Sequence, residues 1–461
     1  MRFFAWTKLQ DFCLRLALLK VVVAFLPCNR SSTSRDLVLR RISQLLFEPK
    51  NCPLRLQRAA ERVYGERPGG GFTAADALLF ISDSPSWGQP IHLTEAALTG
   101  RGVGREAATT YKILEWAQVV SLVTPGMQGN QLTERGLLLR TLMPTEPVEA
   151  FVKGDVEAWN PFVLTPQERL FLCYHLFEHD ELSAQMVVDL GRRASGTQLE
   201  PAEVRRVMSS ALAKVIARAR GKIPLADVPR LSKAAELAQQ IEREVNPSGP
   251  QRVSAPRRPV MSKRGTSARV TRMKNADHQT IPRCEQLIDL GFLTRPEPPR
   301  GAAGRELRRA RNAWTYVVTE QAARFCDAFG VDGLLDEAWL WSRFGQVASA
   351  SGMDRAPQES RPATIAEAVE VFFTEYERIA RPAGHTPFES VAILAVVRAL
   401  SRGLVIEVRQ LHQLMLTLKT EGTFDKFLFF ASGNEVDRMF ILAKPELRQP
   451  LVEWCAARGR A

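Results

Sequence analysis

The feature that most constrains the fold is the stretch from residue 281 to residue 325, where a helical pattern runs directly into a strand pattern. Apolar residues recur three or four positions apart from Ile281 to Leu290, as one buried helix face requires. Gly291 then ends the helix, because glycine accepts the left-handed turn that follows a helix. Residues 292–294 and 314–318 can pair as two short strands. The stretch therefore predicts a helix docked on a hairpin.

Arginines crowd the loop between these two strands. They are Arg295, Arg300, Arg305, Arg308, Arg309 and Arg311. Like charges held this close repel one another, so we expect an anionic partner for the loop.

The order of helix, Leu-Gly-Phe-Leu-Thr, basic loop and returning Val-Val-Thr-Glu-Gln-Ala resembles the winged helix-turn-helix domains of bacterial regulators. In that family the helix lies in the DNA major groove, and the wing touches phosphates or the minor groove. The resemblance implies DNA binding here, with Arg283 and Gln286 on the recognition helix as base readers. A winged helix that serves only for protein docking is the alternative.

Two further copies of the pattern are expected. Residues 92–145 contain a short hairpin followed by Leu-Thr-Glu-Arg-Gly, and this copy could present Arg105 and Lys112 to DNA. Its wing is nearly uncharged, so docking is an equal alternative. A more degenerate copy lies within residues 363–461. Its wing sets Arg438 against Glu435 and Asp437, so we expect protein contact there more than DNA contact.

The fold class expected is mainly α with small β-hairpins, in which several winged-helix domains are joined by helical segments and a basic linker. The expected divisions are an N-terminal helical region (1–91), a first winged helix (92–145), a central helical domain (162–245), a basic flexible linker (246–275), a second winged helix (276–328), a helical connector (329–362) and a C-terminal helical region with the degenerate copy (363–461).

Positive charge is concentrated in one part of the chain. The formal net charge is +12, and residues 247–315 hold fifteen Lys/Arg against five Asp/Glu. The linker has no acid, so it can track phosphates without fixed structure. The nucleic-acid-binding residues expected are Arg257, Arg258, Lys263, Arg264, Arg269, Arg272, Lys274, Arg283, Gln286, Arg295, Arg300, Arg305, Arg308, Arg309, Arg311, Arg105 and Lys112.

Composition favours a cytoplasmic protein. The seven cysteines are scattered and form no Cys-x-x-Cys pair, which argues against a secreted disulfide framework. Residues 12–27 are apolar, but Arg15 and Lys20 interrupt them, and the longest clean run is far short of the roughly 20 residues that span a bilayer. We expect an amphipathic helix covering a core, or a mis-assigned start, rather than a membrane anchor.

The sequence indicates binding rather than catalysis. The glycines at 69–71 are not followed by Gly-Lys-Ser/Thr, and no Rossmann, His-Glu-x-x-His or Gly-x-Ser-x-Gly motif is present. His175 and His179 share a helix face and could ligate a metal, but no third ligand is evident. We expect no cofactor, no metal and no small-molecule substrate.

Three functional readings follow from the sequence. The preferred one is a non-catalytic regulator or DNA-engaging subunit that binds duplex DNA. The second is an adaptor subunit of a bacterial defence or chromosome-maintenance complex, with winged helices as docking modules and protein partners or a second copy bound. The third is a metal-dependent nuclease with dispersed carboxylates.

Overall fold

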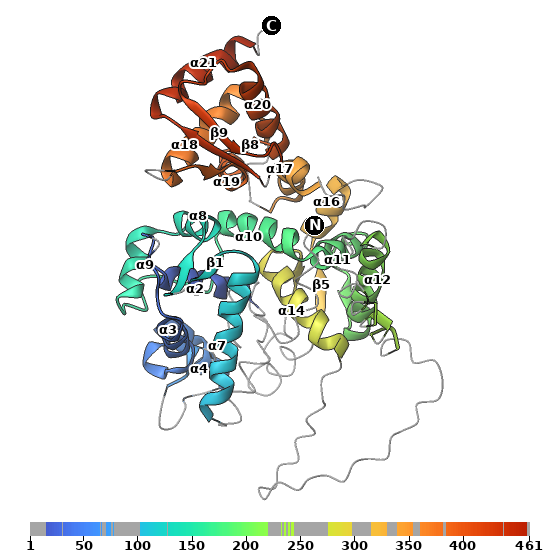
Figure 1. Ribbon diagram of the computed structural model, residues 1–461. Helices are drawn as coiled ribbons and strands as arrows, with labels where there is room; N and C mark the ends of the chain where they lie inside the picture. Colours follow the sequence, from blue (N-terminus) through green and yellow to red (C-terminus); the bar gives the residue numbers. More distant parts are fainter. Residues whose placement is uncertain are drawn as a thin grey trace, which may run out of the picture.

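The structure is a computed structural model, mainly helical with short strand pairs (Figure 1). It describes residues 15–29, 31–64, 66, 71–74, 77, 102–126, 128–219, 232, 235–236, 238–239, 241–243, 275–296, 315–329, 339–353, 360–380, 384–436 and 438–458.

Three times along the described chain, the same order of elements recurs. A helix leads into a short strand, followed by two or three described helices, a second strand, a third strand and a final helix. In the last of the three repeats, an additional two-residue strand lies between the two helices and pairs outside the unit's sheet. In each case the third strand lies between the first and the second. In each case the leading helix also packs against the final one. We call these repeats the first, second and third units.

The first unit is built around α7. Its elements are α2 (Ala17–Phe25), α3 (Arg35–Phe47), η1 (Pro49–Asn51), α4 (Leu54–Tyr64), α7 (Gly102–Val119), β1 (Val123–Gly126), β2 (Gly129–Leu132) and α8 (Glu134–Leu142). The first strand is reduced to one residue, Thr33, which pairs with Asn130 of β2. The Thr133 side chain accepts the Gly136 N–H and so begins α8, as the Leu-Thr-Glu-Arg-Gly phrase predicted.

The first unit begins earlier than the sequence indicated. The helix α2 packs against α3, α7 and α8, so residues 17–64 share a core with residues 102–142 rather than forming a separate N-terminal region. Every residue of α2 is buried, so this helix lies inside the core and is not the amphipathic helix that the sequence predicted. Its Lys20 is tolerated inside because Nζ lies 2.8 Å from a Glu168 carboxylate oxygen.

The second unit surrounds α14. Its elements are α11 (Glu181–Gly191), β3 (Gln198–Leu199), α12 (Pro201–Ala219), α14 (Asn275–Asp289), β4 (Leu293–Thr294), β5 (Tyr316–Val318) and α16 (Glu320–Phe329). Strand β5 pairs with both β3 and β4. Gly291 has φ of 86°, which confirms the left-handed turn expected after the helix.

The third unit lies at one end of the molecule (Figure 1). Its elements are α18 (Ile365–Ile379), β7 (Thr386–Pro387), α19 (Phe388–Leu400), β8 (Leu404–Val405), α20 (Val408–Glu421), β9 (Leu428–Ser432), β10 (Met439–Ala443), η3 (Pro445–Leu447) and α21 (Arg448–Arg458). Its three-stranded sheet is the longest of the three, with β10 paired to β9 over five positions. The copy expected to be degenerate therefore has the fullest strand pairing.

The units are joined by three connecting helices and a strand. These are α9 (Thr145–Val152), α10 (Pro166–His179), α17 (Trp339–Ser351) and β6 (Arg361–Pro362), which pairs in parallel with β8. A capping box formed by Thr165 and Glu168 begins α10. Since α10 packs on α8, α11, α17 and α19, it links all three units.

Candidate nucleic-acid interface

The helix that the sequence singled out as the DNA reader, α14, is enclosed in the protein. From Thr280 to Leu290 every residue is buried, and Arg283 and Gln286 have no exposed surface. The Arg283 Nε atom lies 2.9 Å from an oxygen of Asp180 at the start of α11. The expectation that Arg283 and Gln286 read base edges is therefore wrong for this arrangement, because neither side chain reaches the surface.

The opposite side of α14 is closed by the chain's own N-terminal segment. Arg15 places its guanidinium 2.9 Å from both Glu285 and Asp289, and the Leu16 N–H donates to Asp289 at 2.7 Å. Burial raises the pKa of the Asp289 carboxyl to about 7, although Arg15 acts in the opposite direction. This helix is thus used for packing between the first and second units.

Arg295, expected to serve the wing, has an internal partner. Its guanidinium pairs with Glu285, which also accepts a hydrogen bond from the Tyr316 hydroxyl at 3.0 Å. Only 16% of the Arg295 side chain is exposed. We therefore correct its assignment from phosphate contact to a buried ion pair.

The other predicted residues stay as predictions. Arg105 and Lys112 lie on α7, but their side chains are outside the described part of the structure. Also outside it are Arg257, Arg258, Lys263, Arg264, Arg269, Arg272, Lys274, Arg300, Arg305, Arg308, Arg309 and Arg311.

The third unit has an exposed helix face, which α14 in the second unit lacks. One face of α20 is buried through Leu411, Met415 and Leu418, which recur at helical spacing. The opposite face exposes Arg409, Gln410 and Gln413. Sequence reasoning passed over these polar residues, although the same periodicity that located the buried face also places them outside.

A groove runs along this face between α17 and α20. It has a volume of about 1370 Å³, and most of its lining residues are polar. The lining consists of Ser342, Arg343, Gln346, Ser349, Ala350, Pro362, Ile365, Val405, Glu407, Arg409, Gln410, Gln413, Leu414 and Thr417. Two arginines and three glutamines from the two helices thus line one groove.

Close backbone contact beside this groove fixes α17 relative to the start of α20. A Cβ added at Gly345 would lie 2.2 Å from the Ile406 carbonyl oxygen, so only glycine lets α17 approach this closely. The Glu407 carboxylate accepts the Gly345 and Gln346 N–H groups, at 3.2 and 2.5 Å. These contacts hold α17 against the start of α20.

Glu407 adds little negative charge to the groove. Burial raises the pKa of this carboxyl to about 8, against the lowering by the two backbone donors and by Arg343. Glu407 is the one acid among the described lining residues, and the two arginines Arg343 and Arg409 outnumber it. The groove is therefore cationic through Arg343 and Arg409.

The turn between β9 and β10 is attached to α20. The His412 ring donates from Nε2 to the Asn434 carbonyl at 2.7 Å, and Lys419 donates to the Asn434 side chain at 2.7 Å. Arg438 pairs with Glu435 at 3.1 Å. This turn is consequently held beside α20, and its described charges are largely paired internally.

The histidine pair on α10 is part of a structural junction. Glu178 lies 2.7 Å from Arg135 and 3.4 Å from His175 Nδ1, while Arg135 also reaches Glu389 of the third unit at 3.2 Å. Burial lowers the pKa of His175 to about 4. Because Arg135 lies between Glu178 and Glu389, the cluster serves as an ion-paired contact between units.

Within the described ranges, no group of three or more His, Cys, Asp or Glu side chains could hold a metal ion. No helix in the same part of the chain is long and apolar enough to cross a bilayer. Comparison with protein-family models, with curated proteins and with solved structures found no match for this chain.

Proposed function

We propose that this chain binds nucleic acid, with duplex DNA as the target, and that its three units are winged helices. The first–third–second strand order, with helices between the first and second strands, supports this interpretation of each unit. The observation that carries the proposal is the exposed face of α20 beside the cationic groove. The DNA-contacting helix is then α20 rather than α14.

The chemistry of this face suits a duplex. Arginine donates in a bidentate manner to guanine, and glutamine pairs with adenine, so Arg409, Gln410 and Gln413 carry the side chains used for base readout. Arg343 and Gln346 on α17 can reach the flanking phosphates, because phosphate contacts fix register while base contacts specify sequence.

The basic segment makes a second contribution to the proposed DNA affinity, and this contribution does not depend on the DNA sequence. Residues 247–315 carry fifteen Lys/Arg against five acids. Such a segment releases condensed counterions when it meets DNA, which strengthens binding at low salt. In this scheme the segment attracts the duplex, and α20 determines position along it.

Fluorescence anisotropy with a labelled duplex tests the proposal. Changing Arg409→Ala and Gln413→Ala together should weaken binding by about tenfold or more, because each good base contact contributes about 1–3 kcal/mol. Arg402→Ala is the matched control, since this exposed arginine follows α19 and is not part of the groove lining. Equal affinity of the double variant and wild type would remove α20 from the interface.

A second candidate function is that of a protein-docking adaptor. The helix α14 favours it. The surface that this helix would use to contact DNA is instead packed against another part of the same chain, so a unit of this kind can serve for protein contact. Stoichiometric protein partners on purification, together with no DNA binding at moderate salt, would support this alternative over the first.

A further inference from the structure

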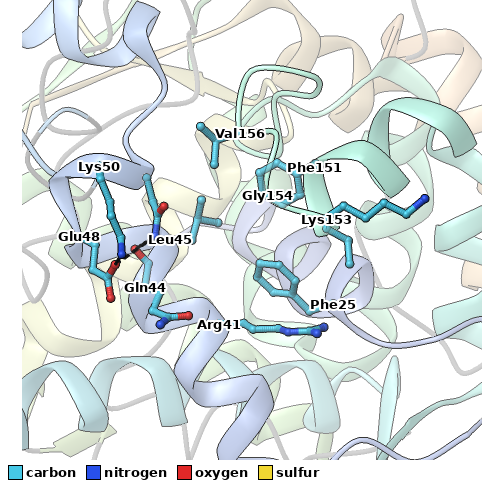
Figure 2. A pocket seen from close by; sticks show the side chains of 12 residues that line it. Phe25, Arg41, Gln44, Leu45, Glu48, Lys50, Phe151, Lys153, Gly154 and Val156 are labelled. Carbon is cyan, nitrogen blue, oxygen red and sulfur yellow. Dashed lines mark hydrogen bonds and ion pairs between the residues drawn. The ribbon is translucent and has the colours of Figure 1, made fainter.

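The aromatic side chains beside the cavity between α3 and the end of α9 are already packed within the chain (Figure 2). The Phe25 and Phe151 rings are buried against each other, with centroids 5.8 Å apart. The guanidinium carbon of Arg41 lies 6.0 Å from the centroid of the Phe25 ring. The third unit, in contrast, leaves apolar side chains uncovered.

The sheet of the third unit has one apolar face that the core does not cover. Its four side chains are Phe429 and Ala431 on β9, with Leu442 and Phe440 directly opposite them on β10. None of the four packs against the described hydrophobic core, and Phe429 is 39% exposed. Phe430, which points to the other face, does pack against the core. We call the four uncovered residues the outer block.

Strand β9 is also an open edge of this sheet. Strand β10 lies between β7 and β9, so one side of β9 has no partner strand among the described residues. The Lys444 N–H donates to the Phe427 carbonyl at 2.8 Å, and hydrogen-bonded pairs alternate along an antiparallel ladder. Phe429 and Ala431 therefore bond to β10, whereas the backbone of Phe430 points away from it. Within the described chain, no group hydrogen-bonds to the Phe430 N–H or carbonyl.

The composition of β9 does not block the addition of another strand. Its sequence, Leu-Phe-Phe-Ala-Ser, contains no charge and no proline, which are the residues that natural proteins use to protect open edges. Lys426 and Glu435 lie beyond its two ends. Aromatic residues also favour strand pairing. An open edge beside an uncovered apolar face indicates an interaction surface.

The free backbone groups of β9 match those of a second, identical strand. When two copies of β9 run antiparallel with Phe430 opposite its counterpart, the two Phe430 residues exchange N–H···O bonds. On the outer face, Phe429 then lies opposite Ala431 of the other copy, so a large side chain meets a small one. The two-fold axis repeats this contact. No like charges face each other within the paired strands.

We propose that this chain forms a two-fold symmetric dimer through β9, in which the two three-stranded sheets join into one continuous sheet. Each copy of β9 covers the open edge of the other, and the two outer blocks become neighbours. This inference is independent of the proposed DNA binding, because Arg409 and Gln413 on the exposed face of α20 take no part in it. The interface is small, so the dimer dissociates on dilution.

Analytical ultracentrifugation of the full chain without DNA, from micromolar to near-millimolar protein, tests the dimer. The mass should rise from one chain to two. Phe429→Lys and Ala431→Lys should each weaken association by about tenfold or more, because the two-fold axis makes one substitution alter two contacts. Val163→Lys is the matched control, since Val163 is also 39% exposed but lies before α10, and it should dimerise as wild type does.

A disulfide tests the register. Residues opposed at a non-hydrogen-bonded position have Cα atoms about 4.5 Å apart, within reach of a disulfide. The Phe429→Cys, Ala431→Cys double variant should therefore form a covalent dimer on mild oxidation. Each single variant should crosslink far less, because its two cysteines lie diagonally, about 7–8 Å apart. Wild type measures the background from the exposed Cys28.

A mass of one chain at every concentration would overturn the proposal. Equal association of Phe429→Lys, Ala431→Lys and Val163→Lys would place the contact elsewhere and refute the assignment to β9. Single cysteine variants that crosslink as readily as the double variant would refute the register. The Arg409→Ala, Gln413→Ala double variant should dimerise as wild type does, which separates a failure of this interface from a failure of the proposed DNA binding.

Discussion

Arg283 on α14 and Asp180 at the start of α11 form an ion pair with no exposed surface, with Nε 2.9 Å and Nη2 3.3 Å from the two carboxylate oxygens. Asp180 also accepts the Ser183 hydroxyl at 2.6 Å. Because a buried guanidinium needs a partner to offset its lost hydration, this pair fixes α14 inside the second unit.

Removing one member of the pair should destabilise the protein strongly. Asp180→Ala leaves Arg283 buried without its carboxylate, and we expect a loss of about 3–5 kcal/mol in the free energy of unfolding. Arg324→Ala is the control, since its pair with Glu320 is more than half exposed on both sides, and exposed pairs contribute about 1 kcal/mol or less. Similar losses in urea unfolding of the two variants would show that the buried pair is not needed.

Gly345 should be intolerant of any side chain. In Gly345→Ala the new Cβ meets the Ile406 carbonyl, so α17 must move away from α20, at a cost of about 1–3 kcal/mol. Ser349→Ala, one turn further along α17, should unfold close to the wild-type temperature. A Gly345→Ala variant as stable as wild type would contradict the close contact.

Glu407 should give the protein a measurable pH dependence. Its folded pKa of about 8 lies above the ordinary value of 4.5, so its contribution to stability is complete below that ordinary value and is lost as pH rises through 8. Glu407→Gln cannot ionise. Its free energy of unfolding should therefore fall less than that of wild type between about pH 5 and pH 9.

The exposed Glu453→Gln is the control for Glu407→Gln, and it should keep the wild-type pH profile. If the free energy of unfolding of Glu407→Gln falls as steeply as that of wild type between pH 5 and pH 9, burial of the Glu407 carboxyl does not control the pH dependence of stability.

The arginine-rich loop should control how DNA affinity depends on salt. Changing Arg305, Arg308, Arg309 and Arg311 to alanine should flatten the plot of log affinity against log salt by about 0.9 for each phosphate that the variant no longer neutralises. A variant with Arg40, Arg55, Arg58 and Arg402 changed to alanine removes the same formal charge from exposed positions elsewhere. Identical salt slopes for the two variants would show that the effect depends on net charge alone and not on the arginine-rich loop.

Local structure followed from the sequence where one residue type controls it. Gly291 takes the left-handed turn after α14, and the Leu-Thr-Glu-Arg-Gly phrase follows a short hairpin and leads into α8. These features depend on neighbours three or four positions away, which a sequence pattern contains. The mainly helical class with small antiparallel strand pairs is confirmed for the same reason.

The surroundings of each helix could not be predicted in this way. Periodicity identified one apolar face of α14, but the partner of Arg283 lies 103 positions away and that of Arg15 lies 270 positions away. The one-residue pairing of Thr33 with Asn130 leaves no pattern to detect. Long-range contacts of this kind decide which helix stays exposed, and so they moved the candidate interface from α14 to α20.

The most direct test of this account is photo-crosslinking of a labelled duplex from a benzophenone side chain placed at position 413. A benzophenone at position 453, exposed on α21, is the control. If α20 contacts DNA, position 413 crosslinks and position 453 does not, and unlabelled duplex abolishes the product. Equal crosslinking from both positions, or none from position 413 under conditions where the duplex is bound, would contradict the proposed interface.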